Sequence, residues 1–180
     1  RVLFRSHHSP EFFIAKLRYI LSRYPHIYNI VIDDDAYMFL PVSLIREFAA
    51  KYKRDFDIPF FISGVIPASV ESTKFEALMG SGMIKLRIGI QSGNTRVMKE
   101  VFVRPLHDEK MFTASEIAYR NRKQLAPVQY DLIVDNPWET PEELKDTLRL
   151  VHRLKPPYTF AINSLTLLPG TTIYKMGEIG

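Results

Sequence analysis

The chain has 180 residues, with 24 lysines and arginines against 20 acidic residues, a formal charge of +4, and 46% of its residues are apolar. That composition provides the core of one packed domain, excludes disordered and collagen-like chains, and contains no run of about 18 apolar residues that would span a membrane. Because there is no cysteine, these residues supply no disulfide, no thiol nucleophile and no cysteine ligand for zinc or an iron–sulfur cluster.

Helical and strand patterns alternate along the chain from residue 9 onward. Ser9 and Pro10 are a helix start, and apolar residues then recur at helical spacing. The strand patterns cover residues 27–32, 59–62, 84–90, 128–134 and 159–167. Further helical patterns begin at Pro41, before Phe75, at Asn94, at Asp108 and at Thr140. The predicted order is therefore one helix followed by five strands that helices separate.

The helix that begins at Thr140 carries the strongest start signal. Thr140 and Glu143 have the spacing of a capping box, with Pro141 at the first helical position. The residues expected to form its buried face are Leu144, Leu148, Val151 and Leu154.

Strands that are separated by crossover helices predict a parallel sheet with both faces covered, so the expected class is α/β. In both closed barrels and open doubly wound sheets, ligands bind at the carboxyl ends of the strands. The polar residues at those ends are Asp33, Asp34, Asp35, Ser63, Gln91, Ser92, Asp135, Asn136, Asn163, Ser164 and Thr166. We expect them to converge on one rim. The glycine fingerprint of a dinucleotide fold is missing after the first strand.

The positive charge lies mainly at helix ends, where it complements the helix dipoles. Basic clusters at 51–54, 120–123 and 153–155 end helical patterns, and acidic residues begin them. Since a nucleic-acid site needs basic residues gathered on one face, we do not expect this chain to bind nucleic acid.

Three consecutive aspartates, Asp33, Asp34 and Asp35, follow the first strand pattern. Such a triplet can bind a divalent cation, accept hydrogen bonds from an amine or a ribose, or form a solvated loop. Its place at the end of a strand favours a functional site, but the spacing alone leaves all three interpretations open.

Two longer stretches are more distinctive than composition explains. Residues 89–94 (GIQSGN) with the later Arg104, and residues 130–140 (YDLIVDNPWET), resemble the fourth- and fifth-strand motifs of the radical S-adenosylmethionine (SAM) superfamily. Residues 167–171 (LLPGT) are similar to its sixth-strand end, and the aspartate triplet is similar to the acidic second-strand end of its cobalamin-binding branch. The resemblance covers residues 9–174.

This resemblance implies a partial (βα)6 TIM-like barrel that holds strands two to six of the radical SAM core. The family carries its Cys-x-x-x-Cys-x-x-Cys motif, which holds a 4Fe-4S cluster, after the first strand, so the cluster ligands are expected outside this chain. The intact enzyme is then expected to cleave SAM reductively to a 5'-deoxyadenosyl radical, for hydrogen abstraction or cobalamin-dependent methyl transfer. A small-molecule substrate, a reductant such as ferredoxin or flavodoxin, and a cytoplasmic location follow from the same resemblance.

The resemblance also assigns residues to the cofactor. Asp33, Asp34 or Asp35 is expected to bind the ammonium group of SAM, and Arg104 its carboxylate through two parallel hydrogen bonds. Gln91 and Ser92 are assigned to the methionine or ribose part, Ile133 to adenine, and Asp131 and Asp135 to the ribose. No catalytic residue and no metal ligand is assigned. The sequence departs from the family at Asp135 and Trp138, where glycine is common.

The first six residues, RVLFRS, resemble the translation of a sequencing-library adapter. We therefore expect residues 1–6 to be non-native, residues 7–180 to form one partial barrel domain, and the chain to be a fragment from a metagenomic sample. Two alternatives remain: a divalent-metal-dependent barrel hydrolase or isomerase that uses the aspartate triplet, and a non-catalytic scaffold domain without a cluster.

Overall fold

The computed structural model describes residues 8–104 and 108–179, and the expectation for residues 1–6 lies outside them. The elements in chain order are α1 (Pro10–Arg23), β1 (Ile30–Asp33), η1 (Tyr37–Phe39), α2 (Val42–Asp55), β2 (Phe60–Val65), η2 (Pro67–Ser69), α3 (Ser72–Met79), β3 (Met83–Gln91), the π-helical η3 (Val97–Val101), α4 (Asp108–Arg120), β4 (Val128–Val134), α5 (Pro141–His152), β5 (Tyr158–Ser164) and α6 (Thr172–Ile179). No helix among them is both long and apolar enough to cross a membrane.

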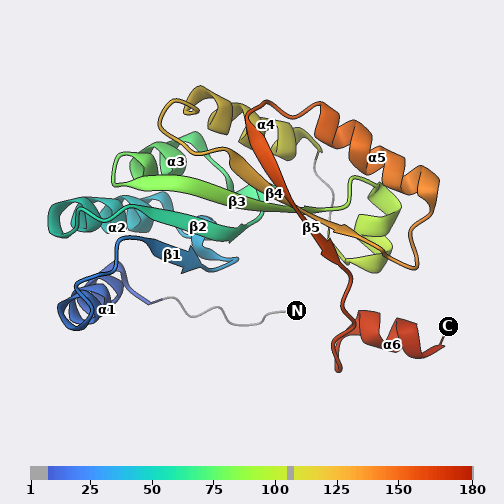
Figure 1. The fold of residues 1–180 in the computed structure, drawn as a ribbon, viewed down its shortest axis with the longest axis horizontal. Helices are drawn as coiled ribbons and strands as arrows, with labels where there is room; N and C mark the ends of the chain where they lie inside the picture. The colour runs from blue at the N-terminus through green and yellow to red at the C-terminus, as the bar shows by residue number, and fades with distance from the viewer. Residues whose placement is uncertain (1–7, 105–107, 180) are drawn as a thin grey trace.

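The five strands form one parallel sheet in the order β1-β2-β3-β4-β5. Figure 1 shows the sheet curving, with α1 to α5 following one face and α6 lying beyond the end of β5. Because all four strand pairs are parallel, all carboxyl ends lie at one edge. The predicted α/β class and partial barrel-like sheet are confirmed.

The core lies between the sheet and α1 to α5. Residues alternate along β3, so that Leu86, Ile88 and Ile90 are buried against the helices while Arg87 and Gln91 on the opposite face are half-buried. Each fully buried side chain of this kind stabilises the fold by about 1.5–3 kcal/mol. Among the described residues α1 to α5 follow one face of the sheet, and strand residues such as Val31 and Ile162 are exposed, so the prediction that both faces are covered was wrong there.

The helix starts were predicted well where capping side chains are present. Ser9 accepts a hydrogen bond from the Phe12 N–H, and Thr140 and Glu143 form the expected capping box. The buried face predicted for α5 is confirmed for Val151 and Leu154 and wrong for Leu144 and Leu148, which are 36% and 60% exposed. Thr147 and Leu150 are buried in their place, and Thr147 contacts the loop after β3.

The chain after β5 also differs from the prediction. The strand ends at Ser164 and not at residue 167, and the eight-residue helix α6 follows at Thr172. Thr171 accepts a hydrogen bond from the Tyr174 N–H and donates one to the Leu168 carbonyl, which begins this helix locally.

Candidate functional site

A cavity of about 390 Å³ lies at the carboxyl ends of β3 and β4. It gathers three of the residues predicted to contact a cofactor, namely Gln91, Arg104 and Ile133. The other lining residues come from the end of η3, from the segment after β5 and from the start of α6: Val101, Phe102, Val103, Leu165, Thr171, Thr172 and Ile173. The position is the one that parallel sheets use for ligands.

The backbone around this cavity is unusual. Three non-glycine residues of the described chain have left-handed φ angles, and all three lie at or beside the cavity: Gln91 (65°), Val103 (52°) and Asp135 (61°). Such conformations are uncommon, and for a β-branched residue such as valine they are true outliers. Local strain of this kind clusters at ligand sites, where the surrounding fold maintains it.

Gln91 is held at the end of β3 by its neighbour two residues earlier. The side-chain amide of Gln91 folds back over Gly89, and a Cβ at Gly89 would collide with that amide. A side chain at this position would displace the Gln91 amide from the place it takes here. Arg104, at the other end of the same loop, is exposed, and its N–H donates to the Met98 carbonyl at 2.8 Å.

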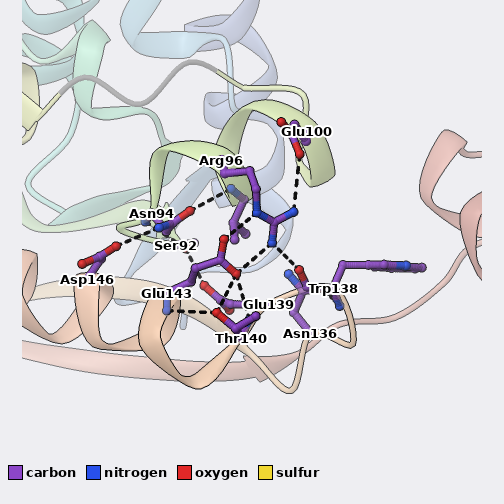
Figure 2. A network of polar contacts seen from close by, with 11 residues as sticks. Ser92, Asn94, Arg96, Glu100, Asn136, Trp138, Glu139, Thr140, Glu143 and Asp146 are labelled. Carbon is purple, nitrogen blue, oxygen red and sulfur yellow. Dashed lines mark hydrogen bonds and ion pairs between the residues drawn. The ribbon is translucent and has the colours of Figure 1, made fainter.

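Ser92 does not line the cavity, although it follows Gln91. It is fully buried, its Oγ donates to Glu139 Oε1 at 2.8 Å, and it accepts from the Asn94 N–H at 3.1 Å. Burial is the main cause that raises the pKa of Glu139, against the lowering effect of the Ser92 hydrogen bond. Figure 2 shows Ser92 and Glu139 inside a polar network between the loop after β3 and α5.

Asp131 and Asp135 lie near the cavity without lining it. Asp131 accepts from Arg87 Nε at 2.7 and 2.8 Å across β3 and β4, so its carboxylate already has a cationic partner. Asp135 is exposed just after β4. Trp138, the second departure from the family, is half-buried, and a Cβ at Gly177 of α6 would lie 3.9 Å from its ring.

The three aspartates lie at the end of β1, two strands away from β3. Asp33 and Asp34 line a separate cavity of about 410 Å³ between β1, α1 and α2. Asp33 accepts from the Ser63 hydroxyl, and Asp34 accepts from the Ala36 N–H at 2.8 Å, while Asp35 is exposed. In the part of the chain that the structure describes, no three histidine, aspartate or glutamate side chains come together to hold a metal ion.

A set of residues that joins the loop after β3 to α5 was not predicted from the sequence. Arg96 donates to Glu143 Oε2 at 2.8 Å and to the Trp138 carbonyl at 2.6 Å, and Gly93 N–H donates to Thr147 Oγ1 at 2.7 Å. The capping box identified Glu143 as a helix-start residue, but nothing in the sequence indicated a partner 47 residues away.

The fold is similar to those of solved radical SAM enzymes. Coproporphyrinogen III oxidase HemN of Escherichia coli aligns with a TM-score of 0.73 and 22% identity, over 99% of this chain and 42% of that one. The methyltransferase TsrM of Kitasatospora setae, solved with cobalamin and a 4Fe-4S cluster, aligns at 0.67 and 13%, over 87% and 31%. OxsB, solved with aqua-cobalamin and SAM, aligns at 0.67 and 17%, over 94% and 25%.

The described residues thus have the fold of radical SAM enzymes, cobalamin-dependent ones included, which confirms the resemblance at the level of the fold. The chain spans less than half of the length of these three enzymes. No family model and no curated protein matches it.

Proposed function

We propose that the chain is the SAM-binding barrel segment of a radical SAM enzyme. The observation that carries the proposal is the cavity in which Gln91, Arg104 and Ile133 meet, on a fold shared with radical SAM enzymes. These three residues come from two strand ends and one loop, and the sequence resemblance assigns all three to one ligand.

The residues present fit the polar and apolar parts of SAM. Arg104 binds the carboxylate, because a planar guanidinium donates two parallel hydrogen bonds to it. Gln91 offers a side-chain amide to the methionine or ribose part, and Ile133 packs against adenine. The aspartates at the end of β1 lie two strands from β3 and line a separate cavity, so in this proposal they do not bind the ammonium group, which is attached to the same carbon as the carboxylate that Arg104 binds.

When bound, SAM supplies a carbon-centred radical or a methyl group, and the protein's part is to orient it and exclude water. The residues present do not fit an iron–sulfur cluster, since the sequence has no cysteine and the described residues form no metal-ligand group. The proposal therefore places the cluster ligands outside these 180 residues. Cobalamin, a small-molecule substrate, a ferredoxin or flavodoxin reductant and a cytoplasmic location belong to the proposal for the intact enzyme.

The test is a calorimetric titration of the 180-residue chain with SAM. We expect saturable binding that weakens about 10- to 100-fold in Arg104→Ala, because a charged hydrogen bond contributes about 1.5–3 kcal/mol. The matched control is Arg122→Ala, which removes an exposed arginine that lies over the Tyr119 ring at 4.0 Å, away from the cavity. Equal loss in both variants, or no binding by the unmodified chain, would contradict the proposal.

A further inference from the structure

The loop that joins Gln91 to Arg104 is tied to α5 at two depths. In the interior, Ser92 Oγ donates at 2.8 Å to Glu139, which lies just before α5, and Gly93 N–H donates at 2.7 Å to Thr147 Oγ1 of α5. Closer to the surface, Arg96 reaches Glu143. Because the loop begins and ends with cavity residues, whatever fixes the loop also fixes the cavity.

The inner tie brings the two backbones into direct contact. A Cβ at Gly93 would lie 2.6 Å from the Cα of Thr147 and 2.9 Å from the Asp146 carbonyl oxygen, so only glycine fits there without a shift. This contact anchors the loop two residues after Gln91. It does not reach the other end of the loop, where the chain turns toward Arg104.

The outer tie is made by one guanidinium. Arg96 binds both carboxylate oxygens of Glu143, donates to the Trp138 carbonyl at 2.6 Å and lies 3.4 Å from Glu100. Figure 2 shows Arg96 between the helical turn that carries Glu100 and the start of α5. A rigid, two-pronged donor of this kind fixes the distance and the angle between the elements it joins.

Arg96 links one wall of the cavity to segments that follow the strand of Ile133. Arg96 directly precedes η3, whose last residue, Val101, begins the wall that ends at Arg104. Trp138 belongs to the segment that follows the Ile133 strand, and Glu143 lies in the first turn of α5. The side chain of Glu143 is itself fixed, since it also accepts from the Thr140 N–H at 2.9 Å.

We propose that Arg96 is a positioning residue that holds the η3 wall, and with it Arg104, in place against the segment after Ile133. The identity of the cavity's ligand rests on the proposed function, whereas the role of Arg96 in fixing the η3 wall is independent of it. Truncation of Arg96 releases the η3 wall and leaves the inner tie at Gly93 intact.

Hydrogen exchange of the 180-residue chain tests the positioning directly. The reporters are the amides of Phe102 and Arg104, which donate to the Val97 and Met98 carbonyls at 3.1 and 2.8 Å. In Arg96→Ala we expect both amides to exchange about tenfold faster or more, at conditions where the rest of the sheet stays protected. Arg96→Lys keeps the positive charge but cannot donate two parallel hydrogen bonds, so it should recover part of the protection.

The matched control is Thr140→Ala, which removes the cap of α5 at the same carboxylate without removing Arg96. This variant is destabilised, but the two reporter amides should keep their protection. If Arg96→Ala and Thr140→Ala change the reporter amides equally, or if Arg96→Ala leaves them unchanged, the inference is wrong.

Titration with SAM separates this inference from the proposed function. Arg96→Ala should weaken SAM binding about tenfold although Arg104 is present, because the Arg104 guanidinium is then displaced from its binding geometry. Thr140→Ala should bind SAM as the unmodified chain does. If the unmodified chain binds no SAM, the proposed function fails and the exchange experiment still decides on Arg96. If the unmodified chain and Arg96→Ala bind SAM equally, the positioning inference is overturned and the proposed function stands.

Discussion

At the scale of single residues, the left-handed backbone of Asp135 explains a departure from the family. Glycine is common at this position in the radical SAM resemblance, and the structure shows a φ of 61° there. Glycine adopts such an angle without steric cost, and aspartate is one of the few other residues that visit it. The angle at this position is thus one that both glycine and aspartate can adopt.

This leads to a prediction about stability. Asp135→Gly should leave the free energy of unfolding unchanged or raise it by up to about 1 kcal/mol, because relief of the left-handed strain offsets the greater freedom of glycine in the unfolded chain. Asp135→Val should lower it by about 2 kcal/mol, since a β-branched residue resists positive φ. Urea unfolding measures both. The control is Asp57→Val, at an aspartate whose φ is not positive. If Asp135→Val and Asp57→Val lower the free energy of unfolding equally, the explanation by backbone strain is wrong.

Residue identity alone did not determine which predicted site residues reach the cavity. Gln91 and Ser92 are adjacent in sequence, yet one lines the cavity and the other is fully buried. Ser92 donates a hydrogen bond from its hydroxyl to Glu139, which lies 47 residues later in the chain. Long-range pairs of this kind, like Arg87 with Asp131, follow from packing and carry no local sequence signal.

At the scale of elements, start signals were informative and buried faces less so. Ser9 and the Thr140 capping box predicted the starts of α1 and α5, because capping depends on neighbouring residues. The buried face of α5 depends on what lies across from it, and Thr147 lies across from Gly93, whose N–H donates to the Thr147 hydroxyl. Helix α6 was missed because the segment before it was predicted to continue as a strand.

The first turn of α5 also predicts how stability depends on pH. The hydrogen bonds from Arg96, and then the Thr140 N–H, lower the pKa of Glu143 to about 2. Since the folded pKa lies below the unfolded value of about 4.3, this carboxylate stabilises the fold above that pH and loses its contribution as the pH falls toward 2. Glu143→Gln, which keeps a capping-box side chain, should flatten the loss of stability in this window.

Urea unfolding between about pH 5 and pH 2 measures this effect. The unmodified chain should lose stability more steeply than Glu143→Gln, and the two should approach each other at the acid end. Some slope remains in the variant because Asp55, bonded to Arg54 and Arg18, also has a pKa lowered to about 2. If the free energy of unfolding falls with pH in parallel for the two proteins, the Arg96–Glu143 ion pair does not contribute to stability as expected.

At the scale of the whole molecule, the parallel sheet and its carboxyl-end rim were predictable because strand and helix patterns alternate along the chain. The structure further shows which rim residues meet. Gln91 and Ile133, from adjacent strands, line one cavity with Arg104, whereas the aspartates of β1 lie two strands away. Figure 1 shows β1 and β5 as the outer strands of the sheet. Both edges are of the kind that further strands pair with.

The measurement that tests the central claim most directly is the sequence of the source DNA upstream of Ser6, translated in the same frame. The account predicts a Cys-x-x-x-Cys-x-x-Cys motif before Ser9, because the 180 residues contain no cysteine to hold a cluster. With that motif present, anaerobic reconstitution of the cluster and SAM cleavage become the next experiments. An open frame that begins with methionine and carries no such cysteines would contradict the radical mechanism and favour a scaffold domain without a cluster.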